Sequence, residues 1–267
     1  MHNVNPAGQR NRRYTSRLQK GGALLEDMRV LVRSWGDDMP GLLQARGVRD
    51  NILAKQSRAR VAETYRLAFL PRFVNGNPAE AWRIVRPLED RHLPNEVVRP
   101  VYYWITARSE PLLYDFVTEE LFHRRRNQAS FIRPDETVTW ILNGLASDQS
   151  WSPTVAEKVA RGLLAALRDF GILEGAAKKK IAPIYLPLQA FVYLAFALHQ
   201  TGPSGERLVQ HPDWRLFLMS SEAVEQRFLE AHRNDLLSYD AAGRIIRIGF
   251  PVNTLEEMAD VLSQRPN

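Results

Sequence analysis

Cysteine is absent from the 267 residues of this sequence, and histidine occurs only six times. The absence of cysteine excludes disulfide bonds, zinc sites built on thiolates and a cysteine nucleophile. The histidines stand singly, and no two have the spacing of metal ligands on a helix. We therefore expect no metal site. A chain without disulfides also fits a reducing cytoplasm, which is the location that we expect for the protein.

The sequence also lacks the short motifs that mark common enzyme classes. It has no glycine-rich phosphate loop of the P-loop or dinucleotide type, no Gly-x-Ser-x-Gly elbow and no His-Glu-x-x-His. Carboxylates are plentiful, but many occur as adjacent pairs such as Glu119-Glu120, and adjacent residues on a helix do not share a face. A site assembled from distant residues is left open. We predict no catalytic residues, no cofactor and no enzyme activity.

One uncharged run could be mistaken for a membrane span. Residues 181–198 carry no charge and follow three lysines, but Pro183, Pro187 and Gln189 interrupt the run. Pro187 indicates the start of a helix over residues 188–200, which would be too short to cross a bilayer. The N-terminus is polar and has no apolar segment of the signal-peptide type, so we expect no leader. We predict a core helix after Pro187 and no association with a membrane.

Positive charge is concentrated in the first part of the chain. The net charge is +6, but residues 1–75 hold fourteen Lys and Arg against six Asp and Glu, a net charge of +8, and the rest of the chain carries −2. Hydrophobic content of 45% and charged content of 25% are ordinary for a soluble globular protein. The positive charge of the N-terminal third indicates a polyanion as partner. An interpretation with similar support is that the basic surface only keeps the protein soluble.

The stretch 135–187 has the order of elements found in a winged helix-turn-helix. Helices are predicted at 135–145 and from Pro153 to about Phe170, and Ser152 would cap the second one. In this second helix, apolar residues recur every three or four positions, at Val155, Val159, Leu163, Leu167 and Phe170. A basic turn at 178–180 and a strand at 181–186 would follow as the wing. The second helix of such a unit enters the DNA major groove by its N-terminal end, where Thr154, Lys158 and Arg161 lie off the apolar face.

The N-terminal segments hold further candidate contacts. Residues 1–13 look disordered, and their arginines would either hold phosphate or only solubilise the chain. Helices are predicted at 23–35, at 40–54 and from Arg58 onward, with Ser57 as the N-cap of the third. The apolar face of the third helix would consist of Val61, Tyr65, Ala68 and Phe69. Together the helices form either a second helix-turn-helix or a plain three-helix bundle with solvated arginines, and the bundle is slightly favoured.

The remaining segments give weaker indications. Helices are predicted around 79–87, 96–106 and 111–126, and the run Tyr102-Tyr103-Trp104 favours a packed aromatic core over base stacking. Near the C-terminus, a helix at 222–237 precedes a strand at 244–250 whose isoleucines alternate with Arg247, and a short helix at 255–262 ends the chain. Because helix and hairpin repeat the order of the central unit, a second winged unit is one interpretation of this part.

Several stretches of the chain carry a family resemblance. They are Tyr14-Thr15, Lys20-Gly21-Gly22-Ala23-Leu24-Leu25, Asn51-Ile52-Leu53, Leu112-Leu113-Tyr114-Asp115-Phe116, and the segment from Ser152 to Leu173 that ends in Phe170-Gly171-Ile172-Leu173. These stretches resemble the BrxA family, small accessory proteins of the BREX bacteriophage-defence systems. The resemblance covers about residues 14–200, and the chain beyond looks like an extension.

The resemblance implies a mainly helical, DNA-binding protein without catalytic activity. Such a protein would act beside the methyltransferase, ATPase and phosphatase-like components of the same defence cluster, which are candidate partners. A similarity suggested between the family and the helical RNA-binding antitermination factor NusB keeps RNA open as a ligand. The oligomeric state is not indicated by the sequence.

We therefore predict a mainly α-helical protein with winged helix-turn-helix-like units and small β-hairpin wings. The predicted segments are a basic arm at 1–13, an N-terminal helical domain at 14–75, a helical connector at 76–134, a winged helix-like unit at 135–200 and a C-terminal helix-plus-hairpin extension at 201–267. The expected function is non-enzymatic binding of double-stranded DNA within a BREX-type defence system. The alternatives are a protein-interaction scaffold of the defence complex, supported by the aromatic residues around 102–116, and an RNA-binding regulator.

The residues expected to contact DNA are basic, apart from one threonine at the start of the central helix. They are Arg10, Arg12, Arg13, Arg17, Lys20, Arg58, Arg60, Thr154, Lys158, Arg161, Lys178, Lys179 and Lys180. Lysine and arginine contacts of this kind mostly hold phosphate and position the protein. We expect modest sequence specificity, because the first turns of the central helix contain no Asn or Gln and one Arg for reading base edges.

Overall fold

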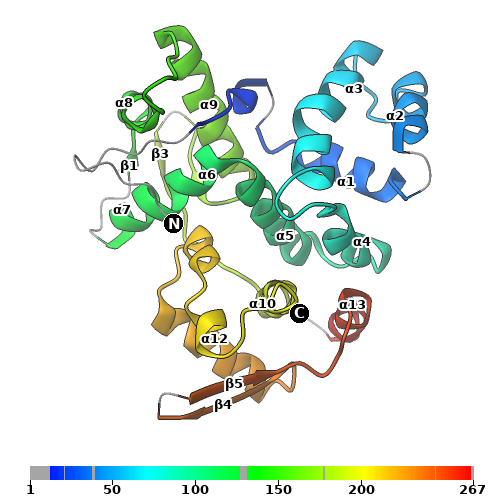
Figure 1. The fold of residues 1–267 in the computed structure, drawn as a ribbon, viewed down its shortest axis with the longest axis vertical. Coiled ribbons are helices and arrows are strands. Elements are labelled where there is room, and N and C mark those ends of the chain that lie inside the picture. The colour runs from blue at the N-terminus through cyan, green and yellow to red at the C-terminus, as the bar shows by residue number, and fades with distance from the viewer. Residues whose placement is uncertain are drawn as a thin grey trace.

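The protein is described by a computed structural model that covers residues 13–20, 22–37, 40–126, 131–176, 178–243 and 245–265. Within these residues it is mainly helical with two small antiparallel sheets, which agrees with the predicted fold class at this level. The C-terminal helices and hairpin, drawn from yellow to red in Figure 1, form the lower end of the molecule. Arg10 and Arg12 lie outside the described residues.

Three helices follow a single 3₁₀ turn in the N-terminal part. The 3₁₀ helix η1 spans Arg17–Lys20, and α1, α2 and α3 span Leu25–Ser34, Pro40–Arg49 and Arg58–Thr64. The chain continues from α3 into the π-helical segment η2, Tyr65–Val74. Ser57 caps α3 as predicted, because its hydroxyl accepts a hydrogen bond from the Arg60 backbone N–H at 3.3 Å. The predicted apolar face of this helix is buried.

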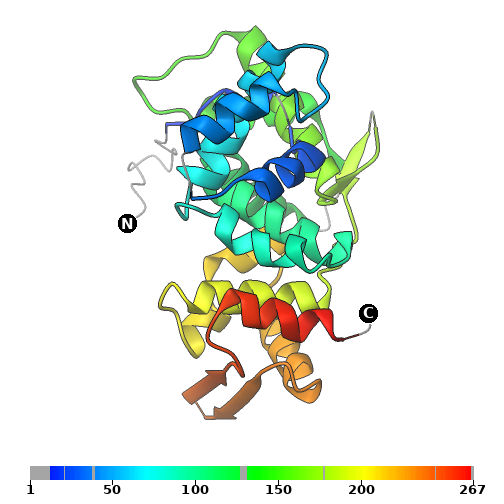
Figure 2. The ribbon, with the colours of Figure 1, turned by 90° about the vertical axis from the view of Figure 1, so that its right-hand side faces the viewer.

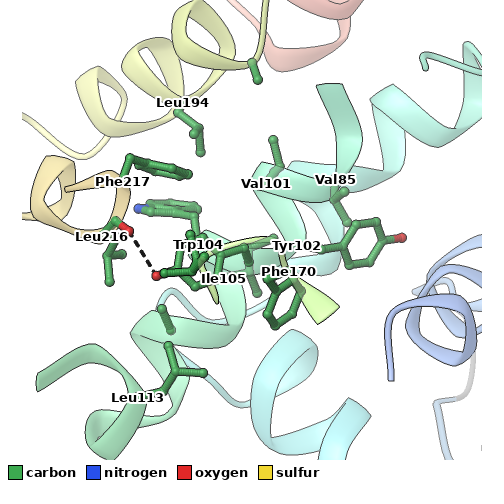
Figure 3. Packing of buried hydrophobic residues seen from close by; sticks show 14 of the residues in the cluster. Val85, Val101, Tyr102, Trp104, Ile105, Leu113, Phe170, Leu194, Leu216 and Phe217 are labelled. Atoms are coloured by element: carbon green, nitrogen blue, oxygen red, sulfur yellow. Dashed lines mark hydrogen bonds between the residues drawn. The ribbon is translucent and has the colours of Figure 1, made fainter. Parts of the chain in front are cut away.

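The connector places one long helix at the centre of the molecule. Its elements are α4 (Trp82–Asp90), α5 (Asn95–Ser109), α6 (Pro111–Asp115), the π-helical η3 (Phe116–Leu121) and α7 (Phe122–Arg126). Ten of the fifteen residues of α5 are buried. Figure 3 shows Tyr102, Trp104 and Ile105 of α5 in this core, and the Tyr103 hydroxyl donates to the Leu216 carbonyl at 3.0 Å. The aromatic run is therefore core, as predicted.

The central unit consists of two helices and a three-stranded sheet. Its elements are β1 (Phe131–Ile132), α8 (Pro134–Gly144), α9 (Pro153–Asp169), β2 (Leu173–Glu174) and β3 (Lys179–Ile181). The strand order is β1-β3-β2, with β3 antiparallel to both neighbours. The strand predicted at 181–186 is wrong, because β3 ends at Ile181 and begins within the lysine triplet. Pro183 has no N–H to donate and closely follows the end of this ladder.

The C-terminal part surrounds a buried helix. Its elements are α10 (Leu188–His199), α11 (Glu206–Val209), the 3₁₀ helix η4 (Pro212–Phe217), α12 (Ser221–Arg233), β4 (Ser238–Ala242), β5 (Ile245–Gly249) and α13 (Leu255–Ser263). All residues of α10 from Gln189 to Leu198 are buried, which confirms the predicted core helix. Figure 2 shows α13, in red, lying along it. None of the helices in the described residues has the length and apolar character needed to span a bilayer.

One continuous cluster of buried residues runs from Tyr14 to Leu262, so the N-terminal, central and C-terminal parts share a core. Polar contacts reinforce this joining. The Asp213 carboxylate of η4 accepts hydrogen bonds from Trp104 Nε1 at 2.6 Å, from Arg108 Nη1 at 2.7 Å and from the Tyr114 hydroxyl at 2.9 Å. Because one donor is the Arg108 guanidinium and all three donors come from α5 and α6, this buried cluster fixes the C-terminal part on the connector.

Candidate nucleic-acid interface

The helix α9 has one buried face, one face covered by η1 and one exposed face. Val159, Leu163, Leu167 and Phe170 are buried and Val155 is half-buried, which confirms the predicted apolar stripe. The Ser152 hydroxyl accepts from the Val155 backbone N–H at 3.4 Å, as predicted for the N-cap. On another face, a Cβ at Gly162 would lie well inside contact distance of the Leu18 carbonyl oxygen. The glycine therefore allows η1 to pack directly on α9.

The exposed face of α9 carries the three predicted contact residues. Thr154, Lys158 and Arg161 are all exposed. Arg161 pairs with Glu157 one turn earlier, with 3.6 Å between Nη2 and the carboxylate oxygen, and both side chains are more than half exposed. Such a pair contributes little to stability and is easily exchanged for a phosphate. Lys158 has no acidic partner among the described residues, so its charge is fully available.

The predicted wing is only partly available to a polyanion. The Lys180 ammonium lies 2.7 Å from the Glu174 carboxylate, its cross-strand neighbour on β2. Lys179 donates to the Ala176 carbonyl at 2.8 Å. Lys178 is exposed and has no acidic partner in the described part of the chain. Within the triplet, a carboxylate pairs with Lys180, a neutral carbonyl holds Lys179, and Lys178 has neither kind of partner, whereas the sequence predicts three equivalent cations.

The start of the described chain lies against the connection between α8 and α9. Arg13 forms an ion pair with Asp148 in this connection. The Gln149 side chain accepts from the Tyr14 backbone N–H at 3.1 Å and donates to the Tyr14 carbonyl at 2.6 Å. These contacts, between residues 135 positions apart, hold the N-terminal segment beside the two helices of the central unit. The sequence predicts a basic arm but gives no indication of where it is anchored.

The other predicted cations gather around η1 and α3. Arg17, Lys20 and Arg60 line a common pocket, together with Lys55, which is not among the residues predicted from the sequence. Arg58 of α3 and Arg66 of η2 are exposed outside this pocket. Within the described residues, Arg58, Arg60 and Arg66 have no acidic partner. Burial raises the pKa of Tyr65, on the buried face of the same helical stretch, to about 12, so this phenol stays neutral and adds no negative charge.

The two basic helices point toward the same end of the molecule. In Figures 1 and 2 the N-terminal ends of α3 and α9 both lie at the upper end. The 3₁₀ helix η1, dark blue in Figure 1, lies between them and contacts both α9 and η2. The exposed cations of α3 and α9 therefore belong to one end of the molecule. No group of three or more His, Asp or Glu side chains in the described ranges is arranged to hold a metal ion.

Comparison with known proteins identifies the family. A model of the BrxA family matches residues 12–197, well over half of the chain. The chain belongs to the BrxA family. Membership makes it a BREX-associated protein, and the match extends from the N-terminal anchor through the central unit into α10. A search of curated proteins finds no match.

A solved structure supports the fold alone. The crystal structure of an uncharacterized protein from Magnetospirillum magneticum is similar with a TM-score of 0.54 and 16% identity. The similarity covers 77% of this chain and 98% of that protein. At this identity the likeness carries no statement about function.

Proposed function

We propose that this BrxA-family protein is a non-enzymatic DNA-binding component of a BREX-type phage-defence system, and that α9 enters the major groove by its N-terminal end. The observation that carries the proposal is the exposed Lys158, which has no acidic partner among the described residues and lies on the outer face of α9 in the second turn after a capped helix start. A cation at this point of a recognition helix reaches phosphate or base edges.

The arrangement around α9 supports a winged helix-turn-helix. Two packed helices are followed by the hairpin β2-β3, and β1, which precedes the helices, pairs with β3 as a third strand. The connection between the helices, residues 145–152, is longer than the three or four residues of a simple helix-turn-helix. We propose that Lys178, at the tip of the hairpin, contacts the DNA backbone as the wing.

The unpaired arginines of α3 add a second basic surface. Because α3 and α9 point toward the same end of the molecule, one duplex lying across that end would meet both. Contacts from α3 would hold phosphate and carry no sequence information by themselves. We therefore propose strong salt dependence and modest sequence specificity.

The aromatic residues that supported the alternative function, a protein-interaction scaffold, are buried. Tyr102, Tyr103, Trp104 and Phe116 are each about 1% exposed, so none is available to a partner protein. RNA is attracted by the same cations as DNA. A competition experiment, in which unlabelled RNA displaces labelled duplex DNA from the protein, distinguishes the two ligands.

The test is fluorescence anisotropy of a labelled duplex with the full chain. We expect Lys158→Glu and Arg161→Glu, combined, to weaken binding by at least about tenfold, because two favourable charges become repulsive. Arg168→Glu is the control for the single change Lys158→Glu, since it makes the same change of charge at an exposed residue near the opposite end of the same helix. Equal losses from these two single variants would show that only overall charge matters and would remove the N-terminal end of α9 from the interface.

The wing has its own test. We expect Lys178→Ala alone to cause most of the loss seen when Lys178, Lys179 and Lys180 are all changed to Ala, because Lys179 and Lys180 already have partners. Anisotropy at two salt concentrations measures both the affinity and its salt dependence. A single variant without effect beside a strongly weakened triple variant would contradict this assignment.

A further inference from the structure

A basic cavity lies between η1, the turn after α2, and α3. Its volume is about 350 Å³, within the roughly 300–1,000 Å³ typical of small-molecule sites. Four cations line it against a single acidic side chain, Glu63. The cations are Arg17, Lys20, Lys55 and Arg60. Arg17 and Lys55 also pair with Glu110 and Asp27 outside the lining, so Arg60 supplies the surplus positive charge that favours an anion.

Two of the cations are held in place by neighbouring groups. The Asn51 side chain donates to the Lys55 carbonyl at 2.8 Å and accepts from its backbone N–H at 3.0 Å, and the Lys55 ammonium lies 2.7 Å from Asp27. Arg17 donates through Nη2 to the Ser109 carbonyl and to Glu110, both at 3.4 Å. These contacts fix the cations before a ligand arrives, which lowers the entropic cost of binding.

The other two cations are available. The Lys20 ammonium lies 3.6 Å from a carboxylate oxygen of Glu63. Because both side chains are well exposed, this ion pair is weak. Arg60 has no acidic partner within the described residues. Its guanidinium offers the planar set of donors that matches phosphate oxygens. The cavity thus combines cations held by neighbouring groups with an exposed arginine that has no acidic partner among the described residues.

The lining of the cavity is partly apolar. Leu24, Leu67 and Ala68 contribute to it, and Leu24 adopts a left-handed backbone conformation with φ of 50°. An apolar wall beside a cluster of cations suits a ligand that has both a charged and an apolar part. A nucleotide has this chemistry, because its phosphate suits the cations and the face of its base suits the leucines.

We propose that this cavity binds the phosphate group of a nucleotide, with Arg60 as its main ligand. The nucleotide is either free in solution or part of a bound nucleic acid, and the phosphate ester is common to both. The site is separate from α9 and does not rest on the DNA-binding role proposed for that helix.

Calorimetric titration of the full chain with ADP and with pyrophosphate tests the site. We expect one ADP to bind per chain and Arg60→Gln to weaken its binding at least about fivefold, since a charge-assisted contact is lost. Arg66→Gln is the matched control, because it removes the same charge from η2, the direct continuation of α3, outside the cavity. Leu67→Trp narrows the cavity without changing its charge and should weaken ADP more than pyrophosphate.

Anisotropy with duplex DNA separates the two sources of phosphate. If neither small probe binds but Arg60→Gln weakens duplex binding more than Arg66→Gln, the phosphate belongs to the DNA backbone and the site stands. If Arg60→Gln and Arg66→Gln behave alike with every probe, the proposal is overturned. Lys158→Glu should leave ADP binding unchanged, so failure of the α9 interface and failure of this cavity give different results.

Discussion

Breaking the buried ion pair between Arg72 and Glu110 should destabilise the whole protein. The Arg72 side chain is 0% exposed and that of Glu110 is 1% exposed. Arg72 Nε donates to the Glu110 carboxylate at 3.0 Å and its Nη1 donates to the Gly22 carbonyl at 3.1 Å. Glu110 also forms an ion pair with Arg17, with 3.4 Å between Arg17 Nη2 and the carboxylate oxygen. This cluster joins η1, η2 and the connection between α5 and α6.

The expected loss follows from leaving one charge buried without its main partner. Replacing Arg72 by Met should cost roughly 3–5 kcal/mol, as breaking a buried pair usually does. This is a large part of the roughly 5–15 kcal/mol by which folded domains are stable. At about 2–4 °C for each kcal/mol, the melting temperature should fall by roughly 6–20 °C. The double variant Arg72→Met with Glu110→Gln should lose less than the sum of the single losses, because neither of these two buried positions then holds a charge.

Differential scanning calorimetry and urea unfolding followed by tryptophan fluorescence measure these losses. Arg46→Met is the control, because Arg46 pairs with Asp50 on the surface, with 71% and 43% of the side chains exposed. Its loss should stay within about 1 kcal/mol. The reasoning is refuted if Arg72→Met costs no more than this control, or if the double variant loses the full sum.

Three further changes test other contacts. Gly162→Ala should lower stability by roughly 1–3 kcal/mol, because the new Cβ forces α9 away from the Leu18 carbonyl, and a raised melting temperature would contradict the packing. Asp213→Asn should cost roughly 1.5–3 kcal/mol in urea unfolding, since its carboxylate accepts a charge-assisted bond from Trp104, and an unchanged midpoint would argue against that cluster. Burial lowers the pKa of His211 below 6.5, so the unfolded chain takes up the proton first as the pH falls. The stability that this histidine contributes above about pH 6.5 should therefore be lost as the pH falls through its lower folded-state pKa. In His211→Gln, the melting temperature measured from about pH 5 to 7.5 should depend less on pH than in the unmodified chain.

Local signals made much of the helical fold predictable. The start of α9 follows from Ser152 and Pro153, and that of α3 from Ser57, because caps act within a few residues. The inward faces of both helices follow from apolar periodicity. The extent of β3 could not be read in this way, because its pairing with Phe131 is set by a residue about fifty positions away.

The candidate site was less predictable for the same reason. The sequence shows which residues are basic, but the partners of Arg13 and Arg17 lie in other elements, about a hundred residues away. Lys55 could not be identified from the sequence as part of the site, because only the fold places it in the same cavity as the residues of η1. A glycine inside an otherwise regular helix, Gly162, was the available signal that another backbone approaches α9 closely.

The most direct test of the proposed function is the salt dependence of duplex binding by the unmodified chain, measured by fluorescence anisotropy with unlabelled RNA as competitor. The account predicts binding at micromolar concentration or tighter at low salt. The logarithm of affinity should fall with the logarithm of salt concentration by about 0.9 for each phosphate contacted, a slope of about 2 or more. RNA should compete less well than the same mass of duplex DNA. Absence of binding at low salt, or a flat salt dependence, would contradict the account.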